Sequence, residues 1–265
     1  MKKIFLCLPM QSTFSIPTNS ETLIHLLKLK YGKYLVEEAF DADCSIDIIQ
    51  NENQYNFSSE LYSGITTSPL SELDRYIFDH TTYDDKVFAL HGGVVEWQQN
   101  AYLFLAPTTS GKTTLTSYLT SRGCGYLTDD CILLDRADFT IHPCSTPIQL
   151  RDGGAEVLKR YQALPTDLQL LEEGTTFRRW VYTPKNCIEK AIPLKRIFFI
   201  ERTENENALV YMNTTERITA LMKSPITNYQ VNGDYLRFLS RLAKVDCHIL
   251  RYCDMNFVKE LIQNG

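Results

Sequence analysis

The segment from Ala106 to Thr113 (APTTSGKT) constrains this chain more than any other stretch of its sequence. It matches the phosphate-loop pattern G-x-x-x-x-G-K-[ST] except at the first position, where alanine replaces glycine. The apolar run at residues 101–105 (AYLFL) predicts a buried strand, and residues 113–120 predict a helix that ends at Arg122-Gly123. Strand, loop and helix in this order surround an anion with backbone N–H groups and a helix N-terminus. The sequence therefore predicts a phosphate-binding loop.

Each position of this loop has an expected role. Lys112 would neutralise the outer phosphates of a nucleotide, and the Thr113 hydroxyl would bind Mg²⁺. A Ser/Thr-rich turn before a helix is also ordinary capping chemistry, and alanine at the first position would be strained if a positive φ angle were required there. The positions expected to bind the nucleotide are Ala106, Pro107, Thr108, Thr109, Ser110, Gly111, Lys112, Thr113 and Thr114.

Two adjacent carboxylates, Asp129 and Asp130, begin 17 positions after Lys112 and precede the apolar run 131–134. Adjacent side chains at the mouth of a strand point to opposite faces, so one could approach a metal and the other an acceptor. Their pKa values could also be pushed apart, which suits general-base catalysis. Asp-Asp pairs are common in surface turns, but the spacing from Lys112, with one helix between, favours a functional pair.

A third feature lies upstream of the loop. Residues 88–95 (FALHGGVV) predict a strand, a turn or bulge at His91-Gly92, and a second strand. A lone histidine beside glycines is usually structural.

These features together resemble the catalytic core of the HPr serine kinase/phosphorylases, in order and in the spacing from loop to Asp-Asp. The resemblance covers about His91 to Asp135 and is looser over residues 192–262. Residues 192–200 look like a late core strand of these kinases, and residues 247–252 look like their last strand before a closing helix. HPr-kinase-like proteins tied to peptide modification, such as lasso-peptide precursor kinases, are similar too.

The resemblance implies an α/β fold with a phosphoenolpyruvate-carboxykinase-like P-loop core that binds ATP and Mg²⁺. It implies that Lys112 binds phosphates, Thr113 binds Mg²⁺, Asp129 is the base, Asp130 assists at the metal or the hydroxyl, and His91 lies beside the phosphates. The glycine-rich signature that follows the Asp-Asp strand in these kinases is not recognisable, and residues 147–154 (PIQLRDGG) stand in its place. We therefore expect a kinase that runs in the forward direction only.

The remaining sequence predicts two regions. Residues 1–68 predict a small N-terminal α+β lobe with a strand at 4–8 and a helix at 20–31, and residues 69–265 predict the catalytic domain. A helix expected at 71–80 would bridge the two.

Later segments offer candidate phosphate ligands. The segment Pro165–Pro184 has few periodic apolar positions and predicts a mobile loop, and residues 204–207 predict the polar tip of a hairpin. Arg178 or Arg179 could reach the transferring phosphoryl group, and Arg151 could face the same site. Otherwise these arginines are solvated surface charges.

Composition narrows the function further. The chain has 265 residues, 44% of them hydrophobic, and a net charge of −5, which argues against a nucleic acid or a membrane surface as partner. Its eight cysteines show no zinc spacing and predict reduced, mainly buried thiols in a cytoplasmic protein, for which a homo-oligomer is an open alternative.

The sequence thus predicts an ATP- and Mg²⁺-dependent phosphotransferase acting on a hydroxyl. The preferred acceptor is a serine or threonine of a small protein or peptide, such as the precursor of a ribosomally made modified peptide. Two alternatives stay open: a sugar or nucleoside kinase on the same scaffold, and a nucleotide-binding regulator without turnover.

Overall fold

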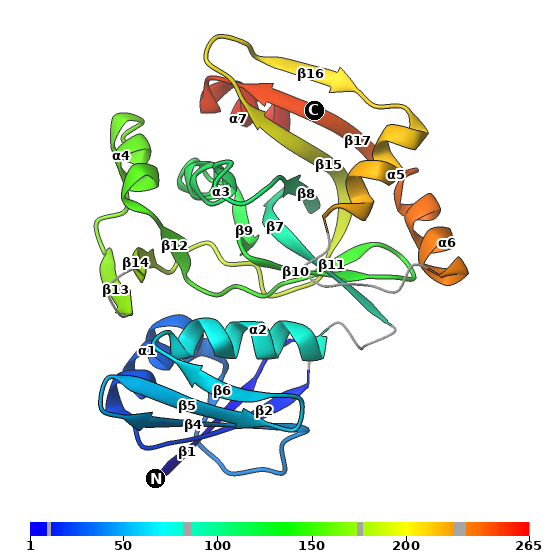
Figure 1. The fold of residues 1–265 in the computed structure, drawn as a ribbon. Helices are drawn as coiled ribbons and strands as arrows, with labels where there is room; N and C mark the ends of the chain where they lie inside the picture. Colours follow the sequence, from blue (N-terminus) through cyan, green and yellow to red (C-terminus); the bar gives the residue numbers. More distant parts are fainter. Residues whose placement is uncertain (10–11, 82–85, 174–176, 225–231, 265) are drawn as a thin grey trace.

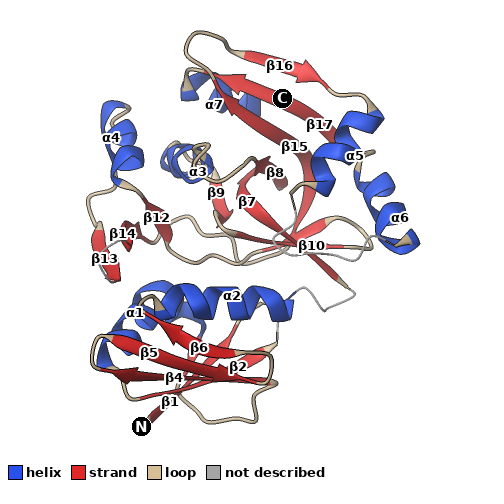
Figure 2. Cartoon of the chain, viewed as in Figure 1, coloured by secondary structure: helices blue, strands red, loops and turns tan. Residues whose placement is uncertain are grey.

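The structure of the protein is a computed structural model that describes residues 1–9, 12–81, 86–173, 177–224 and 232–264. Over these residues it is a mixed α/β protein with three β-sheets, as Figures 1 and 2 show. No helix in this part of the chain is long and apolar enough to cross a membrane.

The N-terminal part of the chain forms a sheet with two helices on it. The strand order is β3-β1-β2-β4-β5-β6. Apolar side chains of both helices share one buried cluster with the strands, and Figure 1 shows the helices between this sheet and the rest of the molecule. The elements are β1 (Lys2–Cys7), β2 (Thr13–Thr18), α1 (Glu21–Tyr31), η1 (Gly32–Tyr34), β3 (Leu35–Val36), β4 (Cys44–Asn51), β5 (Gln54–Ser59), β6 (Ser63–Thr66) and α2 (Pro69–Thr81).

A second sheet forms the centre of the molecule. Seven of its strands run in the order β11-β10-β7-β8-β15-β17-β16, β9 pairs with β7, and β11 also pairs with β15, so the sheet curls back on itself. Its strands are β7 (Val87–Trp97), β8 (Asn100–Leu105), β9 (Gly125–Thr128), β10 (Cys131–Asp135), β11 (Thr140–His142), β15 (Ile192–Arg202), β16 (Ala208–Tyr211) and β17 (Asp246–Tyr252). Its helices are α3 (Lys112–Ser121), α5 (Thr214–Met222), α6 (Gly233–Leu242) and α7 (Met255–Asn264).

The central sheet is covered on both faces, which explains the unbroken apolar run of β8. Tyr102 and Phe104 join the buried cluster that contains residues of α3 and α7. Leu103 and Leu105 alternate with them and join the cluster that contains residues of α5 and α6. Successive side chains of a strand point to opposite faces, so a strand buried on both sides must be apolar at every position.

The third sheet is small and lies beside α3. It contains β12 (Ile148–Leu150), β13 (Gln169–Glu173) and β14 (Phe177–Tyr182), in the order β12-β14-β13, and α4 (Asp152–Arg160) follows β12.

Several sequence predictions are confirmed. The helix expected at 20–31 is α1, capped by the Ser20 hydroxyl, which accepts a hydrogen bond from the Leu23 N–H at 3.2 Å. The strand and helix around the phosphate-loop motif are β8 and α3, and the chain leaves α3 at Gly123 with a φ of 101°. All eight cysteines are free thiols, but the prediction that they are mainly buried holds for only four of them. The division of the chain at residue 68 stays a prediction. The helix that follows this position, α2, packs onto the N-terminal sheet.

Three predictions about loops and turns were wrong. His91-Gly92 makes no turn, because β7 runs unbroken through it and pairs with β10 on one side and β8 on the other. The segment expected as a mobile loop at 165–184 contains the antiparallel strands β13 and β14, while residues 174–176 lie outside the described part of the chain. Residues 204–207 do not close a hairpin, because β16 pairs with β17, which lies between it and β15.

Glycine at position 93 allows α3 to lie close to β7. A Cβ atom there would overlap the Thr116 hydroxyl of α3. We expect Gly93→Ala to lower the free energy of unfolding by about 1–3 kcal/mol, because the helix would have to shift within a packed core. Urea denaturation measures this change.

Gly153→Ala is the matched control, because a Cβ atom at Gly153 of α4 would meet nothing within 4 Å. This change should raise stability by up to about 1 kcal/mol through helix propensity. Equal effects of the two substitutions would show that the contact between α3 and β7 does not require glycine.

Candidate active site

The loop between β8 and α3 turns through two residues in the left-handed region. Gly111, at the N-cap of α3, has a φ of 94°, and Thr109 has a φ of 71°. Ala106 is not among the residues with positive φ, so alanine at the first loop position is unstrained. The unusual backbone angle falls on Thr109 instead, where a non-glycine residue adopts it at some energetic cost.

Lys112 is folded back onto this loop. Its side chain is buried, and Nζ donates hydrogen bonds to the carbonyl oxygens of Ala106 (2.7 Å) and Pro107 (3.0 Å). Burial lowers the pKa of the Lys112 ammonium, and the nearby Asp130 and Asp129 act in the opposite direction. The loop therefore holds a cation whose environment favours a neighbouring anion.

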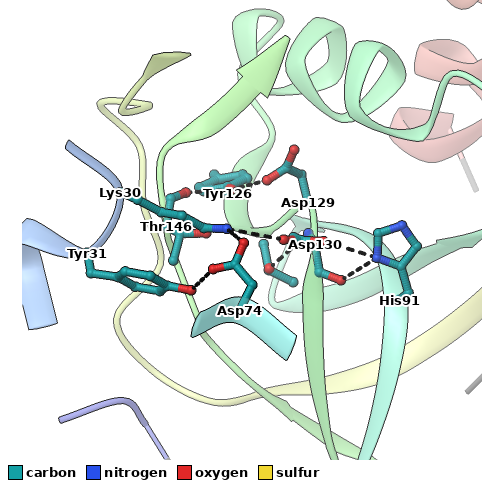
Figure 3. A network of polar contacts seen from close by, with 9 residues as sticks. Lys30, Tyr31, Asp74, His91, Tyr126, Asp129, Asp130 and Thr146 are labelled. Atoms are coloured by element: carbon teal, nitrogen blue, oxygen red, sulfur yellow. Dashed lines mark hydrogen bonds and ion pairs between the residues drawn. The ribbon is translucent and has the colours of Figure 1, made fainter. Parts of the chain in front are cut away.

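Asp129 and Asp130 occupy the break between β9 and β10, which both pair with β7. The carbonyl oxygen of Asp130 accepts a hydrogen bond from the Gly92 N–H at 3.3 Å, so the break lies against the glycine pair of β7. The two carboxylates leave the backbone in different directions, as Figure 3 shows.

Asp129 is only 6% exposed. The hydroxyl of Tyr126 contacts both its carboxylate and a backbone carbonyl oxygen. The Tyr126 oxygen lies 3.0 Å from Asp129 Oδ1 and 2.8 Å from the Thr146 carbonyl oxygen (Figure 3). A tyrosine hydroxyl has one proton, so it can donate to only one of these oxygens, and a protonated Asp129 would satisfy the other contact. Burial, followed by the charge of Asp130, raises the pKa of Asp129 to about 7.

Asp130 has the opposite electrostatic setting. Its Oδ1 lies 3.1 Å from Nδ1 of His91, and its Oδ2 lies 3.9 Å from Nζ of Lys30 (Figure 3). Although burial raises its pKa, the hydrogen bond from His91 and the charge of Lys30 lower it to about 2. One carboxylate is therefore ionised while its neighbour holds a proton up to near-neutral pH.

Lys30 and Asp74 are site residues that the sequence analysis missed. Lys30 comes from α1 and is 5% exposed, and its Nζ lies 2.5 Å from Asp74 Oδ2 of α2. The Tyr31 hydroxyl donates to the other Asp74 oxygen at 2.5 Å. One signal was present in the sequence: Lys30 follows Leu23 and Leu27 on the buried stripe of α1, at a position where an apolar residue is expected.

The loop lysine, the two adjacent carboxylates and the ion pair of Lys30 line one cavity of about 550 Å³. Its lining includes Lys30 and Asp74, and Arg151 and Arg202. Of the residues predicted from sequence, 108–109 and 111–114 line it together with His91, Asp129, Asp130, Arg151 and Arg179.

Four predicted residues do not line this cavity: Ala106, Pro107, Ser110 and Arg178. Ala106 and Pro107 supply the carbonyl oxygens that hold Lys112. Nε of Arg178 lies 3.8 Å from Oε1 of Glu172, and the Arg178 guanidinium packs over the Trp180 ring. Adjacent residues of a strand face opposite sides, so Arg179 faces the cavity and Arg178 faces away.

The cavity also fits the Mg²⁺ that the loop motif implies. Thr113 offers a hydroxyl and Asp130 a carboxylate, both on the cavity wall. Mg²⁺ prefers such oxygen ligands and is commonly held by one or two protein groups together with phosphates and water.

The ion pair of Lys30 yields a prediction for stability. Lys30→Met should lower the free energy of unfolding by about 2–4 kcal/mol, because it leaves two carboxylates without their ammonium partner. Solvent limits this cost, since the side chains of Asp74 and Asp130 are 22% and 33% exposed. Urea denaturation at pH 7 measures the change.

Lys28→Met is its control, because Lys28 is an exposed lysine on the same helix. It should change stability by less than about 0.5 kcal/mol. Equal stability of the two variants would contradict the structural role of Lys30.

No family model and no curated protein matches the sequence. Among solved structures, this chain is similar to the HPr(Ser) kinase/phosphatase from Coxiella burnetii, with a TM-score of 0.33 and 11% sequence identity. The matched region covers 66% of this chain and 94% of the kinase/phosphatase chain.

Proposed function

We propose that this protein is an ATP- and Mg²⁺-dependent kinase that transfers the γ-phosphoryl group to a hydroxyl. The observation that carries the proposal is the shared cavity, which brings the loop lysine Lys112 together with two carboxylates whose pKa values are driven apart. Paired groups of this kind divide the acid, base and metal-binding roles of an active site. The fold proposed with it is a P-loop core of the HPr-kinase-like type in residues 69–265, beside an N-terminal lobe in residues 1–68.

The residues of the cavity have distinct roles in this reaction. Lys112 and the amides at the start of α3 bind the phosphates, and Thr113 and Asp130 would hold Mg²⁺. Bound there, Mg²⁺ supplies positive charge that stabilises the transferring phosphoryl group. His91 keeps Asp130 oriented and ionised through its contact at 3.1 Å.

Asp129 acts as the base in the transfer step. The acceptor oxygen forms a bond to the γ-phosphorus while the bond from that phosphorus to the β–γ bridging oxygen breaks. The bridging oxygen keeps the electron pair and leaves with ADP, and the acceptor proton moves to the Asp129 carboxylate. Arg179 of β14 lines the same cavity, whereas its neighbour Arg178 does not.

The proposed acceptor is a serine or threonine of a small protein or peptide, such as the precursor of a ribosomally made modified peptide. Incubation with Mg-ATP and either HPr, Ser/Thr peptides, sugars or nucleosides, followed by mass spectrometry, locates the phosphate. Phosphorylation of sugars or nucleosides alone would favour the small-molecule kinase. Tight Mg-ATP binding without release of ADP would favour a nucleotide-binding regulator.

Lys112→Ala should lower kcat/KM for ATP turnover on the order of 10²–10³-fold, the usual effect of removing a preorganised charge from an active site. ADP release measures the effect, and thermal unfolding checks that the variant folds. Lys190→Ala, which removes an exposed lysine, is the control and should behave like the wild type. Activity of Lys112→Ala within a few-fold of wild type would refute the proposed site.

Substitution of the two carboxylates should separate their roles. Asp129→Asn should slow phosphoryl transfer by roughly 10²–10⁴-fold, because the general base is lost. Mg-ATP binding should stay intact in this variant. Asp130→Asn should weaken Mg²⁺ dependence and nucleotide affinity together. Single-turnover kinetics and calorimetry measure these two effects, and identical behaviour of the variants would contradict the division of roles.

The pH dependence follows from the same carboxylates. A base must be deprotonated to accept a proton, so the wild-type rate should rise with pH through about 7, where Asp129 loses its proton. The residual activity of Asp129→Asn should lack this rise, whereas retention of the rise in that variant would assign it to another group.

A further inference from the structure

Neither packing nor backbone geometry accounts for the glycine at position 153. It lies in the first turn of α4, where glycine is a poor helix former, and it is not among the glycines with a positive φ angle. A Cβ atom at Gly153 would meet no described residue within 4 Å, whereas one at Gly154 would lie 2.8 Å from the Thr114 hydroxyl oxygen. Close packing of α4 on α3 therefore explains Gly154 alone. Gly153 lines the cavity, so its missing side chain keeps space open in front of α4.

The same face of α4 continues with an apolar residue. Val157 follows Gly153 by four positions, which places both on one side of the helix, and both line the cavity. Val157 is half-buried, because it packs against the apolar cluster that contains residues of α3 and α7. This face of α4 thus offers the cavity a smooth, largely apolar surface.

A cation from the central sheet borders the cavity as well. Arg202 ends β15, is exposed and lines the cavity. It pairs with Tyr252 of β17, whose hydroxyl oxygen would lie 3.4 Å from a Cβ atom at Gly111 of the phosphate loop. β8, β15 and β17 run parallel, so their carboxyl ends meet at one edge of the sheet. Ligands of parallel sheets bind outside this edge.

The order of the strands gives the direction of a nucleotide bound to the loop. β8, which leads into the loop, lies between β7 and β15. Asp129 lies between two strands that pair with β7, on one side of the loop, and Arg202 ends β15, on the other. In an in-line transfer the acceptor and the departing ADP lie on opposite sides of the γ-phosphorus. With Asp129 as the base, ADP would extend away from β7.

The position of α4 agrees with this direction. Its first turn packs against the first turn of α3, at Thr114, and Thr114 directly follows the loop motif. Figure 1 shows α4 and the end of β15 in the upper part of the molecule, and the N-terminal helices that carry Lys30 and Asp74 in the lower part. The smooth face of α4 therefore lies where the phosphates of a bound nucleotide end and its nucleoside begins.

We propose that Gly153 and Val157 of α4, together with Arg202, form the subsite for the nucleoside of the nucleotide. The base would lie flat on α4, since an aromatic ring packs closely on a surface from which no side chain projects. Arginine guanidinium groups stack on aromatic rings, which gives Arg202 its role at the base. This inference rests on the proposed function and assigns the part of the nucleotide that the phosphate loop does not hold.

The test compares Mg-ATP with Mg-tripolyphosphate, which lacks the nucleoside, by calorimetry on the full-length protein. The wild type should bind Mg-ATP roughly tenfold more tightly, as stacking of one base allows. Gly153→Phe fills the space in front of α4 and should lower the affinity for Mg-ATP about tenfold. Its affinity for Mg-tripolyphosphate should change by less than about twofold, because the phosphate loop is untouched. Arg202→Gln should show the same difference between the two ligands, and it does not depend on how α4 tolerates a ring.

Glu156→Phe is the matched control, because it places the same ring at an exposed position of α4 that does not line the cavity. It should bind both ligands like the wild type, and thermal unfolding checks that every variant folds. Equal affinity of the wild type for the two ligands, or an equal loss of both in Gly153→Phe and Arg202→Gln, would overturn the subsite but not the kinase. Absence of Mg-ATP binding in the wild type would overturn both. The expected difference without phosphoryl transfer would uphold the subsite and refute the kinase.

Discussion

The candidate site depends on the charges that surround Asp130. His91 from β7 and Lys30 from α1 both contact this carboxylate, so it joins the central sheet to the N-terminal helices. Two adjacent, partly buried carboxylates repel each other when both are ionised, and the hydrogen bond from His91 together with the charge of Lys30 decides which one keeps its charge. Asp130 is the ionised member, and burial, followed by the charge of Asp130, raises the pKa of Asp129 to about 7. The difference between two chemically identical side chains is therefore set by elements far apart in the chain.

The backbone brings these charges to the phosphate loop. β9 and β10 pair with the same strand, β7, and the interruption between them places Asp129 and Asp130 in the wall of the cavity. Gly93 of β7 leaves space for Thr116, so α3 lies close against the strand and its first residue, Lys112, reaches the same cavity. A larger residue at position 93 would widen the distance between lysine and carboxylates. The site is thus a consequence of how closely helix and strand approach.

Local patterns predicted part of this arrangement. The strand, loop and helix around Lys112 could be recognised because apolar runs and turn residues alternate over a short stretch of sequence. The strands β13 and β14 could not, because the buried residues among those described in them are Leu171, Val181 and Tyr182, which show no alternating period. Lys30 and Asp74 escaped prediction for a different reason. Their contact joins residues 44 positions apart, and it exists only once two helices have packed.

The contact between Lys30 and Asp74 shows how the N-terminal helices relate to the cavity. Apolar clusters alone hold α1 and α2 in place without specifying their exact rotation, because such contacts are not directional. A buried ion pair contributes little net stability compared with apolar residues of similar size, yet its geometry is demanding. The Tyr31 hydroxyl and the Lys30 ammonium each contact one carboxylate oxygen of Asp74. The Lys30 ammonium also lies 3.9 Å from Oδ2 of Asp130. A rotation of either helix would break this set of contacts, so the N-terminal helices are positioned relative to the carboxylates rather than merely attached to the sheet behind them.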